Sequence, residues 1–339
     1  MKESYLYEKL EDKKTGCRTC AHKCLIAPGM FGICGVRKNI DGKLFALNYG
    51  KAISLSIDPI EKKPFFHFLP GTHSLSVATV GCNFRCGNCQ NWQISQLVKK
   101  DKGMLDIGQD ISPEEIVAEA VKSKCPSISY TYTEPTIFLE YALDTMKIAK
   151  EKGIRNTWVT NGFMSDETLN LIEPFLDAAN VDIKSFDDKF YRENCGARVV
   201  PVLDICRKMK KLGIWVEITT LVIPTLSDDK EMLSNIAKFI FSELGGDTPW
   251  HVSGFSGEIS WKLQDLPDTP VKTVKEAYRI GKKAGLNYVY TGNIPGNESE
   301  NTYCSKCGEL CIRRIGYYVE RFDDDGKCPK CSEKLNLIL

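Results

Sequence analysis

Three closely spaced cysteines in the segment GCNFRCGNCQN are the residues best suited to do chemistry. Cys82, Cys86 and Cys89 follow the pattern C-x3-C-x2-C, directly after an apolar run that reads as a strand. Three thiolates on one loop can bind three irons of a cubane 4Fe-4S cluster, which leaves the fourth iron without a protein ligand. A cofactor or substrate can then bind that iron. The competing interpretation is a zinc site or a set of buried cysteines.

A second cysteine group lies near the carboxyl terminus. Cys304 and Cys307 form one C-x2-C pair, and Cys328 and Cys331 form another. Each C-x2-C turn presents two sulfurs to one ion, so the two pairs predict a tetrahedral zinc site of the ribbon or rubredoxin type, with iron as the alternative metal. Cys311 is spare and is expected to be a packed thiol.

A third group lies near the amino terminus and consists of Cys17, Cys20, Cys24 and Cys34. Four thiols can hold either a zinc ion or an auxiliary 4Fe-4S cluster, and the spacing does not decide between them. The turn-rich segment PGMFGICG favours structural zinc, because a fully ligated site needs no redox partner. An auxiliary cluster would instead imply a second role in electron transfer.

The composition limits the class of protein. The chain has 339 residues, of which 42% are hydrophobic, enough for a substantial core, and its 15 cysteines are an odd number that internal disulfides cannot all consume. The charged amino-terminal segment has no apolar signal core, and no window is apolar enough to span a membrane, so we expect a cytoplasmic protein whose cysteines bind metal. The net charge of +1 does not indicate a nucleic-acid-binding surface.

Between the outer cysteine groups, strand patterns alternate with helix patterns. The helix in ISPEEIVAEAVKSK is expected to begin with Ser112 as N-cap, Pro113 at the first helical position and Glu115 completing a capping box. Such alternation favours parallel strands with helices packed outside them. The strands are predicted over residues 73–80, 127–134, 155–162, 178–185, 214–223, 249–255 and 286–293.

Six or seven such units are fewer than the eight of a closed barrel, so we expect an α/β fold with a partial, open (β/α)6 barrel, and a doubly wound sheet as the alternative. In both folds the chemistry lies at the carboxyl ends of the strands. The predicted domains are an amino-terminal cysteine-rich metal-binding region (1–72), the barrel core (73–295) and a zinc-ribbon or rubredoxin-like domain (296–339). A Pro-rich stretch, DPIEKKPFFHFLPG, reads as an extended connection before the core.

The motifs, taken in order, resemble those of the radical S-adenosylmethionine (SAM) enzymes. More specifically, the chain resembles the AmmeMemoRadiSam system radical SAM enzymes, which are relatives of the pyruvate formate-lyase activating enzyme. The resemblance covers nearly the whole chain and rests on CRTCAHKC with GICGVRKN, HFLPG, CNFRCGNCQNWQIS, YTYTEPT, TNG, DIKSF and VYTGN. It implies that the open iron chelates the methionine part of SAM, that one electron cleaves SAM, and that the resulting 5′-deoxyadenosyl radical takes hydrogen from a substrate.

The resemblance also implies roles for residues at the predicted strand ends. The segment YTEP stands where the superfamily usually has a Gly-Gly-Glu-Pro-like segment that binds the SAM amino group, and Tyr132 and Thr133 occupy positions where glycines are commoner. The residues that the resemblance assigns to SAM binding are Thr133, Glu134, Asn161, Gly162 and Asp182.

Lys184 and His251 are the residues that the resemblance places near the reacting groups. Two departures from the family pattern affect the site. Asn88 replaces the aromatic residue that usually precedes the third cysteine, so we expect adenine to stack elsewhere, with Phe84 as a candidate. The segment VSGFSGEIS after His251 lacks the longer basic and His-Pro pattern of the relatives, so their substrate does not transfer to this chain.

The leading hypothesis is therefore a radical SAM enzyme with an unidentified substrate, for which a glycine Cα–H of a partner protein is one candidate. The resemblance implies an electron donor such as flavodoxin or ferredoxin. The alternative is a non-catalytic iron-sulfur and zinc protein that transfers electrons, but YTEP, TNG and DIKS at successive strand ends favour a cofactor pocket. A zinc-ribbon nucleic-acid binder is the weakest interpretation, because the charge is balanced and residues 323–325 are all acidic.

Overall fold

The structure is a computed structural model that describes residues 1–294 and 297–339. Its central sheet has eight strands in the order β16-β15-β14-β13-β12-β11-β9-β8. The strands from β9 to β16 are parallel and lie in chain order, whereas β8 (Ser54–Pro59) pairs antiparallel with β9. The parallel strands are β9 (His73–Ala78), β11 (Ser127–Tyr130), β12 (Arg155–Thr160), β13 (Ala178–Asp182), β14 (Trp215–Val222), β15 (Trp250–Gly254) and β16 (Val289–Gly292).

This strand order confirms the partial barrel. Each crossover leads to the neighbouring strand in one direction, whereas the strand order of a doubly wound sheet reverses in the middle. The order has two ends, β16 and β8, so the sheet is open. All seven predicted strands exist, although each is shorter than predicted. The second ends at Tyr130 because Tyr132 adopts a left-handed backbone (φ 62°), which cannot continue a strand.

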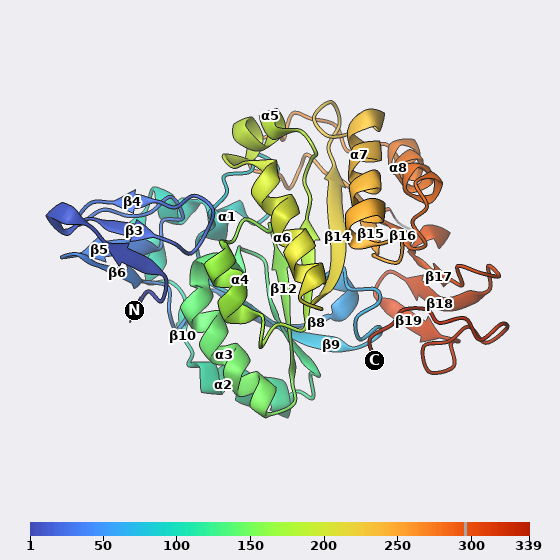
Figure 1. Ribbon diagram of the computed structural model, residues 1–339, viewed down its shortest axis with the longest axis horizontal. Helices are drawn as coiled ribbons and strands as arrows, with labels where there is room; N and C mark the ends of the chain where they lie inside the picture. Colours follow the sequence, from blue (N-terminus) through green and yellow to red (C-terminus); the bar gives the residue numbers. More distant parts are fainter. Residues whose placement is uncertain (295–296) are drawn as a thin grey trace.

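Helices between the strands cover the outer face of the sheet (Figure 1). The predicted capping box is confirmed at the start of α2, where the Ser112 hydroxyl accepts from the Glu115 amide and the Ser112 amide donates to the Glu115 carboxylate. The crossover helices are α2 (Pro113–Lys122), α3 (Leu139–Glu151), α4 (Asp166–Ile172), α6 (Val199–Lys211), α7 (Lys230–Phe239) and α8 (Val271–Lys283), with the shorter α1 (Trp92–Ser95) and α5 (Asp188–Phe190) in loops.

Residues 54–71 contribute more to the barrel than their sequence suggested. The stretch expected to be an extended connection includes the end of β8, and residues 60–71 then fold across the amino end of the barrel. Phe65 and Phe68 are buried there against Ala178 and Trp215, which begin β13 and β14. We call residues 60–71 the amino-end plug. Its aromatic side chains make it part of the core, because burying them outweighs an exposed, extended path.

The amino-terminal region forms small sheets at one side of the barrel, on the left in Figure 1. Buried Arg37 joins this region to α3 through a two-pronged ion pair with buried Glu140, at 2.7 and 2.9 Å. The strands are β1 (Lys2–Glu3), β5 (Arg37–Ile40) and β6 (Lys43–Ala46) in one sheet, β2 (Tyr7–Lys9), β3 (Thr15–Cys17) and β4 (Leu25–Ile26) in another, and the pair β7 (Lys51–Ala52) and β10 (Gln109–Asp110).

The carboxyl-terminal region lies at the other side of the barrel, on the right in Figure 1. It has three antiparallel strands, β17 (Thr302–Tyr303), β18 (Leu310–Ile315) and β19 (Tyr318–Arg321). Backbone hydrogen bonds join Ile338 to the amino-end plug at His67 and Leu69. The predicted domain boundary at residues 295 and 296 lies outside the described residues.

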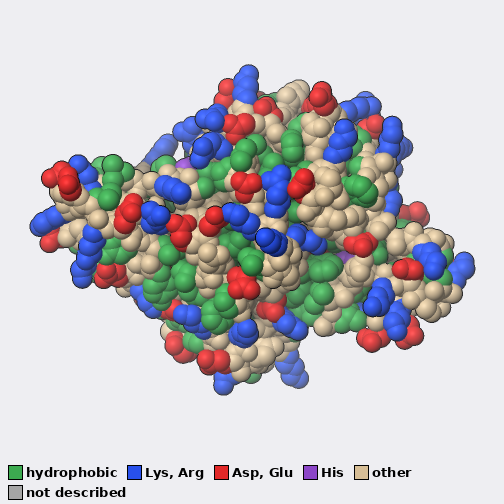
Figure 2. Space-filling model, viewed as in Figure 1, with side chains coloured by type: hydrophobic (Ala, Val, Ile, Leu, Met, Phe, Trp, Pro, Cys, Tyr) green, Lys and Arg blue, Asp and Glu red, His purple; other side chains and the backbone are tan. Residues whose placement is uncertain are grey.

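The surface carries charges of both signs. Figure 2 shows Lys and Arg side chains mixed with Asp and Glu side chains over the face in view. None of the helices in the described part of the chain is long and apolar enough to cross a membrane.

Candidate functional site

The central cysteines lie on the loop that follows β9, at the carboxyl end of the barrel strands. Cys86 is buried, and Cys82 and Cys89 are partly exposed. The Phe84 amide donates to the Cys82 sulfur at 3.4 Å, and the Ser95 hydroxyl lies 3.3 Å from the Cys89 sulfur. Such donors stabilise thiolates that hold an iron-sulfur cluster.

A π-helical turn, Tyr191–Cys195, is hydrogen-bonded to this loop. The Asn194 backbone and side-chain oxygens both accept from the Gly87 amide, and the Asn194 side chain donates to Asn88 at 2.9 Å. A Cβ at Gly87 would lie 2.7 Å from the Asn194 oxygen, so only glycine allows this approach. π-Helical turns occur frequently at functional sites.

The three central sulfurs suit an iron cluster better than a single ion. Among the residues that the structure describes, the only group of three or more cysteines whose sulfurs all lie within 4.8 Å of one another is the carboxyl-terminal one. The three central sulfurs therefore do not converge on one point, which fits ligands of separate irons better than ligands of a single ion. Burial raises the pKa of the Cys82 thiol and Lys99 opposes this, and metal coordination would remove the proton outright. Cys195 lies against Cys86, and the hydrogen bond between these two thiols raises the Cys86 pKa.

Glu134 connects the end of β11 to the end of β12. Its side chain is buried, and both carboxylate oxygens are occupied by protein donors. One oxygen accepts from the amide and hydroxyl of Thr136 and from the Thr160 hydroxyl, and the other accepts from the Asn161 amide at 2.7 Å. Burial raises the pKa of this carboxyl although these donors oppose the shift. The carboxylate therefore positions the two strand ends.

Tyr132 has a left-handed backbone with φ 62°, a conformation that favours glycine. Its phenol donates a hydrogen bond to the Asp58 carboxylate at 2.5 Å. Asp58 also forms an ion pair with buried Lys63, with 2.8 Å between the charged atoms. These contacts stabilise a backbone conformation that a bulky residue rarely adopts. The Tyr132 carbonyl accepts from Asn91, just beyond the cysteine loop, and the Thr133 hydroxyl donates to the Thr79 carbonyl.

Asn161 links the end of β12 directly to the cysteine loop. Its side-chain amide donates to the Asn83 oxygen at 2.7 Å. At position 162, in contrast, glycine is needed because a side chain there would crowd its neighbours. It has φ 68°, and a Cβ there would lie 2.9 Å from Val181 and 3.1 Å from Val202. The structure thus brings Thr133, Glu134 and Asn161 to one edge of the cysteine loop and directs Gly162 into the core.

Asp182 and Lys184 form an ion pair at the carboxyl end of β13, with 2.8 Å between their charged atoms. Burial alone would lower the pKa of Lys184, but the negative charges of Asp182 and of the nearby Cys86 outweigh it and hold the pKa well above its usual value. This cation is therefore close to the central cysteines.

His251 lies elsewhere, near the amino end of the barrel. It is the second residue of β15 and is 3% exposed, and its ring bonds to Glu217 at 2.7 Å and stacks on Tyr290. Glu217 also accepts the backbone amides of residues 66–68 in the amino-end plug. Burial alone would raise the pKa of Glu217, but the bond from His251 holds it below its usual value. His251 thus belongs to a network that fastens the plug.

Phe84, the candidate for adenine stacking, has no free face. Phe84 is 1% exposed and packs edge-on against Phe163 and Tyr191. The Asn88 oxygen accepts from Asn194.

The four carboxyl-terminal cysteines converge as predicted. The sulfurs of Cys304 and Cys331 are 3.6 Å apart, and those of Cys307 and Cys328 are 3.5 Å apart. Four thiolates around one tetrahedral zinc ion would be separated by about 3.8 Å, given a zinc–sulfur bond of about 2.3 Å. Cys311 is buried in the small core beside them, as expected of a packed thiol.

The amino-terminal cysteines line a cavity instead of meeting at one point. Cys17, Cys20, Cys24 and Cys34 surround a mostly enclosed, apolar space that Ile26 and Ile137 also line. This cavity lies beside the cysteine loop, because Asn83 contributes to its wall.

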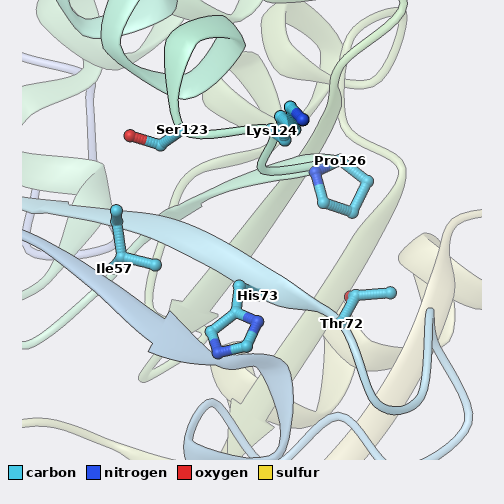
Figure 3. Close-up of a pocket in the computed structure, with 6 residues that line it drawn as sticks. All are labelled: Ile57, Thr72, His73, Ser123, Lys124 and Pro126. Carbon is cyan, nitrogen blue, oxygen red and sulfur yellow. The ribbon is translucent and has the colours of Figure 1, made fainter.

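A larger surface hollow lies away from all three cysteine groups. It is lined by residues at the amino ends of β9 and β11 and at the end of α2, and Figure 3 shows that their side chains surround an open space without converging: Ile57, Thr72, His73, Ser123, Lys124 and Pro126. No cofactor-binding arrangement is formed by these six side chains.

Sequence reasoning missed several residues of the site. Asn83 lies between the cysteines of the motif, where nothing in the pattern distinguishes it. Asn194 and Cys195 come from a turn that is distant in the sequence and carries no motif. Glu217 did have a signal, because a carboxylate within the apolar run IWVEITTLVI must find buried partners.

Comparisons with known proteins agree with this geometry. Residues 76–239 match the radical SAM superfamily. An uncharacterized protein of Methanocaldococcus jannaschii is 46% identical over 342 residues, covering 100% of both chains. The pyruvate formate-lyase-activating enzyme of Clostridium pasteurianum is 24% identical over 200 residues, covering 55% of this chain and 80% of that protein.

Among solved structures, SuiB of Streptococcus suis bound to its precursor peptide SuiA has a similar fold, with a TM-score of 0.51 and 14% identity over 70% of this chain and 52% of that one. The cysteine loop at the carboxyl end of a partial barrel and the family match lead to one conclusion: the chain belongs to the radical SAM superfamily and is an enzyme of that type.

Proposed function

We propose that Cys82, Cys86 and Cys89 hold a 4Fe-4S cluster with one open iron and that the enzyme cleaves SAM reductively beside it. The observation that carries this proposal is the continuous chain of hydrogen bonds from the cysteine loop through Asn83 and Asn161 to Glu134. This chain joins the cysteine loop to the two strand ends that the family uses for SAM. When bound, the cluster supplies one electron for cleavage of SAM to methionine and a 5′-deoxyadenosyl radical.

The protein groups around the loop have separate tasks in this proposal. The Glu134 carboxylate is buried and accepts from protein donors on both oxygens, so we assign the SAM amino group to backbone oxygens of the segment around Thr133. The Lys184 ammonium, which already pairs with Asp182 close to Cys86, faces the SAM carboxylate. Asn161 fixes the distance between the SAM-binding segment and the cysteine loop.

The first experiment measures 5′-deoxyadenosine by mass spectrometry after anaerobic reconstitution with iron and sulfide and addition of dithionite and SAM. We expect product from the parent and from Cys206→Ala, a matched control because Cys206 is a buried cysteine on α6. We expect none from Cys86→Ala. Absence of product from parent protein whose iron and sulfide content shows a loaded central site would contradict the proposal.

We further propose that the hydrogen donor is a glycine Cα–H of a partner protein and that a flavodoxin or ferredoxin supplies the electron. The support is the likeness to activating enzymes, including one described as a putative glycyl-radical enzyme activating enzyme that is 26% identical over 180 residues. A synthetic peptide with Cα-deuterated glycine should transfer deuterium into 5′-deoxyadenosine. Product without deuterium, at an undiminished rate, would count against a glycyl substrate. Replacing dithionite with reduced flavodoxin or ferredoxin tests the donor.

We also propose that the carboxyl-terminal cysteines hold zinc. As a function for this chain, non-catalytic electron transfer is the weaker candidate. The close sulfur spacing supports a single ion. The family assignment favours an enzyme, because an electron carrier needs no SAM-binding strand ends.

A further inference from the structure

The amino-terminal cysteines are arranged unlike the carboxyl-terminal ones. Within residues 1–294 and 297–339, no three sulfurs of Cys17, Cys20, Cys24 and Cys34 lie within 4.8 Å of one another, whereas all four carboxyl-terminal sulfurs do. One tetrahedral zinc ion requires sulfurs about 3.8 Å apart, because each zinc–sulfur bond is about 2.3 Å. A cubane places its four irons at alternate corners, so its four thiolates stand further apart and surround a space. The amino-terminal sulfurs do not converge as the first arrangement requires, and they line one shared cavity.

A glycine lies on the wall of the cavity, close to two of these sulfurs. A Cβ added at Gly32 would lie 3.9 Å from the sulfurs of both Cys24 and Cys34, at the wall of the cavity. The remaining wall is apolar, with Ile26 and Ile137 among its residues. The four cysteines therefore line one shared, mostly enclosed and apolar space.

Two residues that line the cavity each carry a buried N–H group without a partner among the described residues. Arg37 is 2% exposed; its terminal nitrogens bond to Glu140 and Ser4, but its Nε does not. Asn83 is 1% exposed, and its Nδ2 is likewise unpartnered. A buried donor without an acceptor costs about 1–3 kcal/mol, so an acceptor is expected in the cavity. The sulfides and thiolates of an iron-sulfur cluster accept such bonds.

Positive charge surrounds the same site. Arg37 lies near Cys17 and Cys34. Next to Cys34, Lys102 donates to the Gly35 carbonyl at 3.2 Å, and Lys99 passes so close to Gly35 that a Cβ there would lie 3.2 Å from its side chain. A cubane with four thiolates carries net negative charge, which these cations offset.

The cavity also adjoins the central cysteine loop. The His22 ring bonds to the Asn83 carbonyl at 2.9 Å, and a Cβ at Gly81 would lie 3.1 Å from the Cys34 carbonyl. Gly81 directly precedes Cys82, so the two cysteine loops pack backbone to backbone.

We propose that Cys17, Cys20, Cys24 and Cys34 bind a second 4Fe-4S cluster, fully ligated by this chain and adjacent to the central cysteine loop. This arrangement favours the auxiliary cluster over structural zinc, the two interpretations that the spacing left open. With every iron ligated, this cluster has no position for SAM. The inference concerns metal content and does not depend on the proposed reaction.

The test uses the full-length Cys82→Ala/Cys86→Ala/Cys89→Ala variant, which cannot hold the central cluster and leaves the amino-terminal region intact. After anaerobic reconstitution with iron and sulfide, we expect about four irons and four sulfides per chain to remain, against about eight of each in the parent, with an electron paramagnetic resonance signal of a reduced cluster. Zinc in place of iron in the triple variant, or neither metal, overturns the proposal.

A second variant assigns the iron to these cysteines. Adding Cys20→Ser and Cys34→Ser to the triple variant should remove the remaining iron and sulfide while the zinc at the carboxyl-terminal site stays. The matched control adds Cys125→Ser and Cys206→Ser instead, two buried cysteines of the barrel, and should keep the iron. Equal iron in the two quintuple variants would overturn the assignment. If the first of them fails to fold, the iron, sulfide and zinc content of the triple variant still decides the question.

Discussion

At the scale of single residues, the site depends on side chains that hold its backbone in place. Glu134 accepts a backbone N–H on each carboxylate oxygen, from Thr136 and from Asn161. Because the carboxylate is buried and binds a backbone amide on each oxygen, its main role is to hold the two strand ends in place.

Glu134→Gln should therefore impair the site although the change is nearly isosteric. Either orientation of the new amide places an NH2 group against a backbone N–H, which costs about 1–3 kcal/mol. We expect 5′-deoxyadenosine formation to fall by about tenfold or more, in line with that energy. The exposed Glu114→Gln on α2 serves as control. Equal activity of the two variants would show that the carboxylate does not position the strand ends.

Gly162→Ala should destabilise the fold through crowding. A Cβ would meet Val181 at 2.9 Å and Val202 at 3.1 Å, and overpacking of this kind costs about 1–3 kcal/mol. Gly153→Ala is the matched control, because Gly153 has a similar φ of 72° but nothing within 4 Å of the added Cβ. Urea unfolding should show a larger loss for Gly162→Ala. Equal losses would mean that the backbone conformation alone requires glycine.

At the scale of elements, the amino-end plug is held by buried ionisable groups. His67 bonds to Tyr290 at 2.6 Å and to the Asn336 carbonyl at 3.1 Å, and it lies near Glu217, His251 and Arg314. Burial lowers the pKa of His67 from 6.5 to about 4, so the folded protein keeps this ring neutral.

The plug should consequently loosen in acid. Between pH 6.5 and pH 4 the unfolded state binds a proton at His67 that the folded state does not, so stability falls as pH falls, by about 2 kcal/mol at pH 5. His67→Gln should reduce the drop in melting temperature between pH 7.5 and pH 5. His73→Gln, at an exposed histidine, should leave the drop unchanged. If the melting temperature drops equally in both variants, residues other than His67 cause the acid sensitivity.

At the scale of the whole molecule, two cysteine-rich regions flank opposite ends of the barrel. The amino-terminal region packs on the cysteine loop, and the carboxyl-terminal region docks on the amino-end plug. Buried Arg314 fastens the second contact by donating to the Phe66 carbonyl at 2.7 Å and to Thr302 at 2.8 Å, with Glu61 beside it.

Arg314→Leu should destabilise the whole chain, because it leaves the Glu61 carboxylate buried without its cation. Loss of one member of a buried ion pair costs about 3–5 kcal/mol. Arg313→Leu, the neighbouring position on β18 with an exposed side chain, should cost less than about 1 kcal/mol. Chemical denaturation checks both, and zinc content should stay unchanged. Equal effects would show that the docking contact contributes little to stability.

The local features of this protein follow from short stretches of its sequence. Cysteine spacing indicates which thiols share a loop, and alternating strand and helix patterns indicate a parallel sheet, because both signals act over a few residues. The central and carboxyl-terminal cysteine groups, the partial barrel and the capping box at Ser112 could all be read this way.

Tertiary structure alone decided how distant residues meet. It brought Asn194 and Cys195 behind the cysteine loop, assigned His251 to the plug network at the amino end of the barrel, and gave the Glu134 carboxylate to protein donors. It also set the distances among the amino-terminal sulfurs. The cysteine spacing alone had left open whether these sulfurs bind zinc or an iron-sulfur cluster. These outcomes depend on packing between segments far apart in the chain, and burial, rather than local propensity, selects the partners of each polar group.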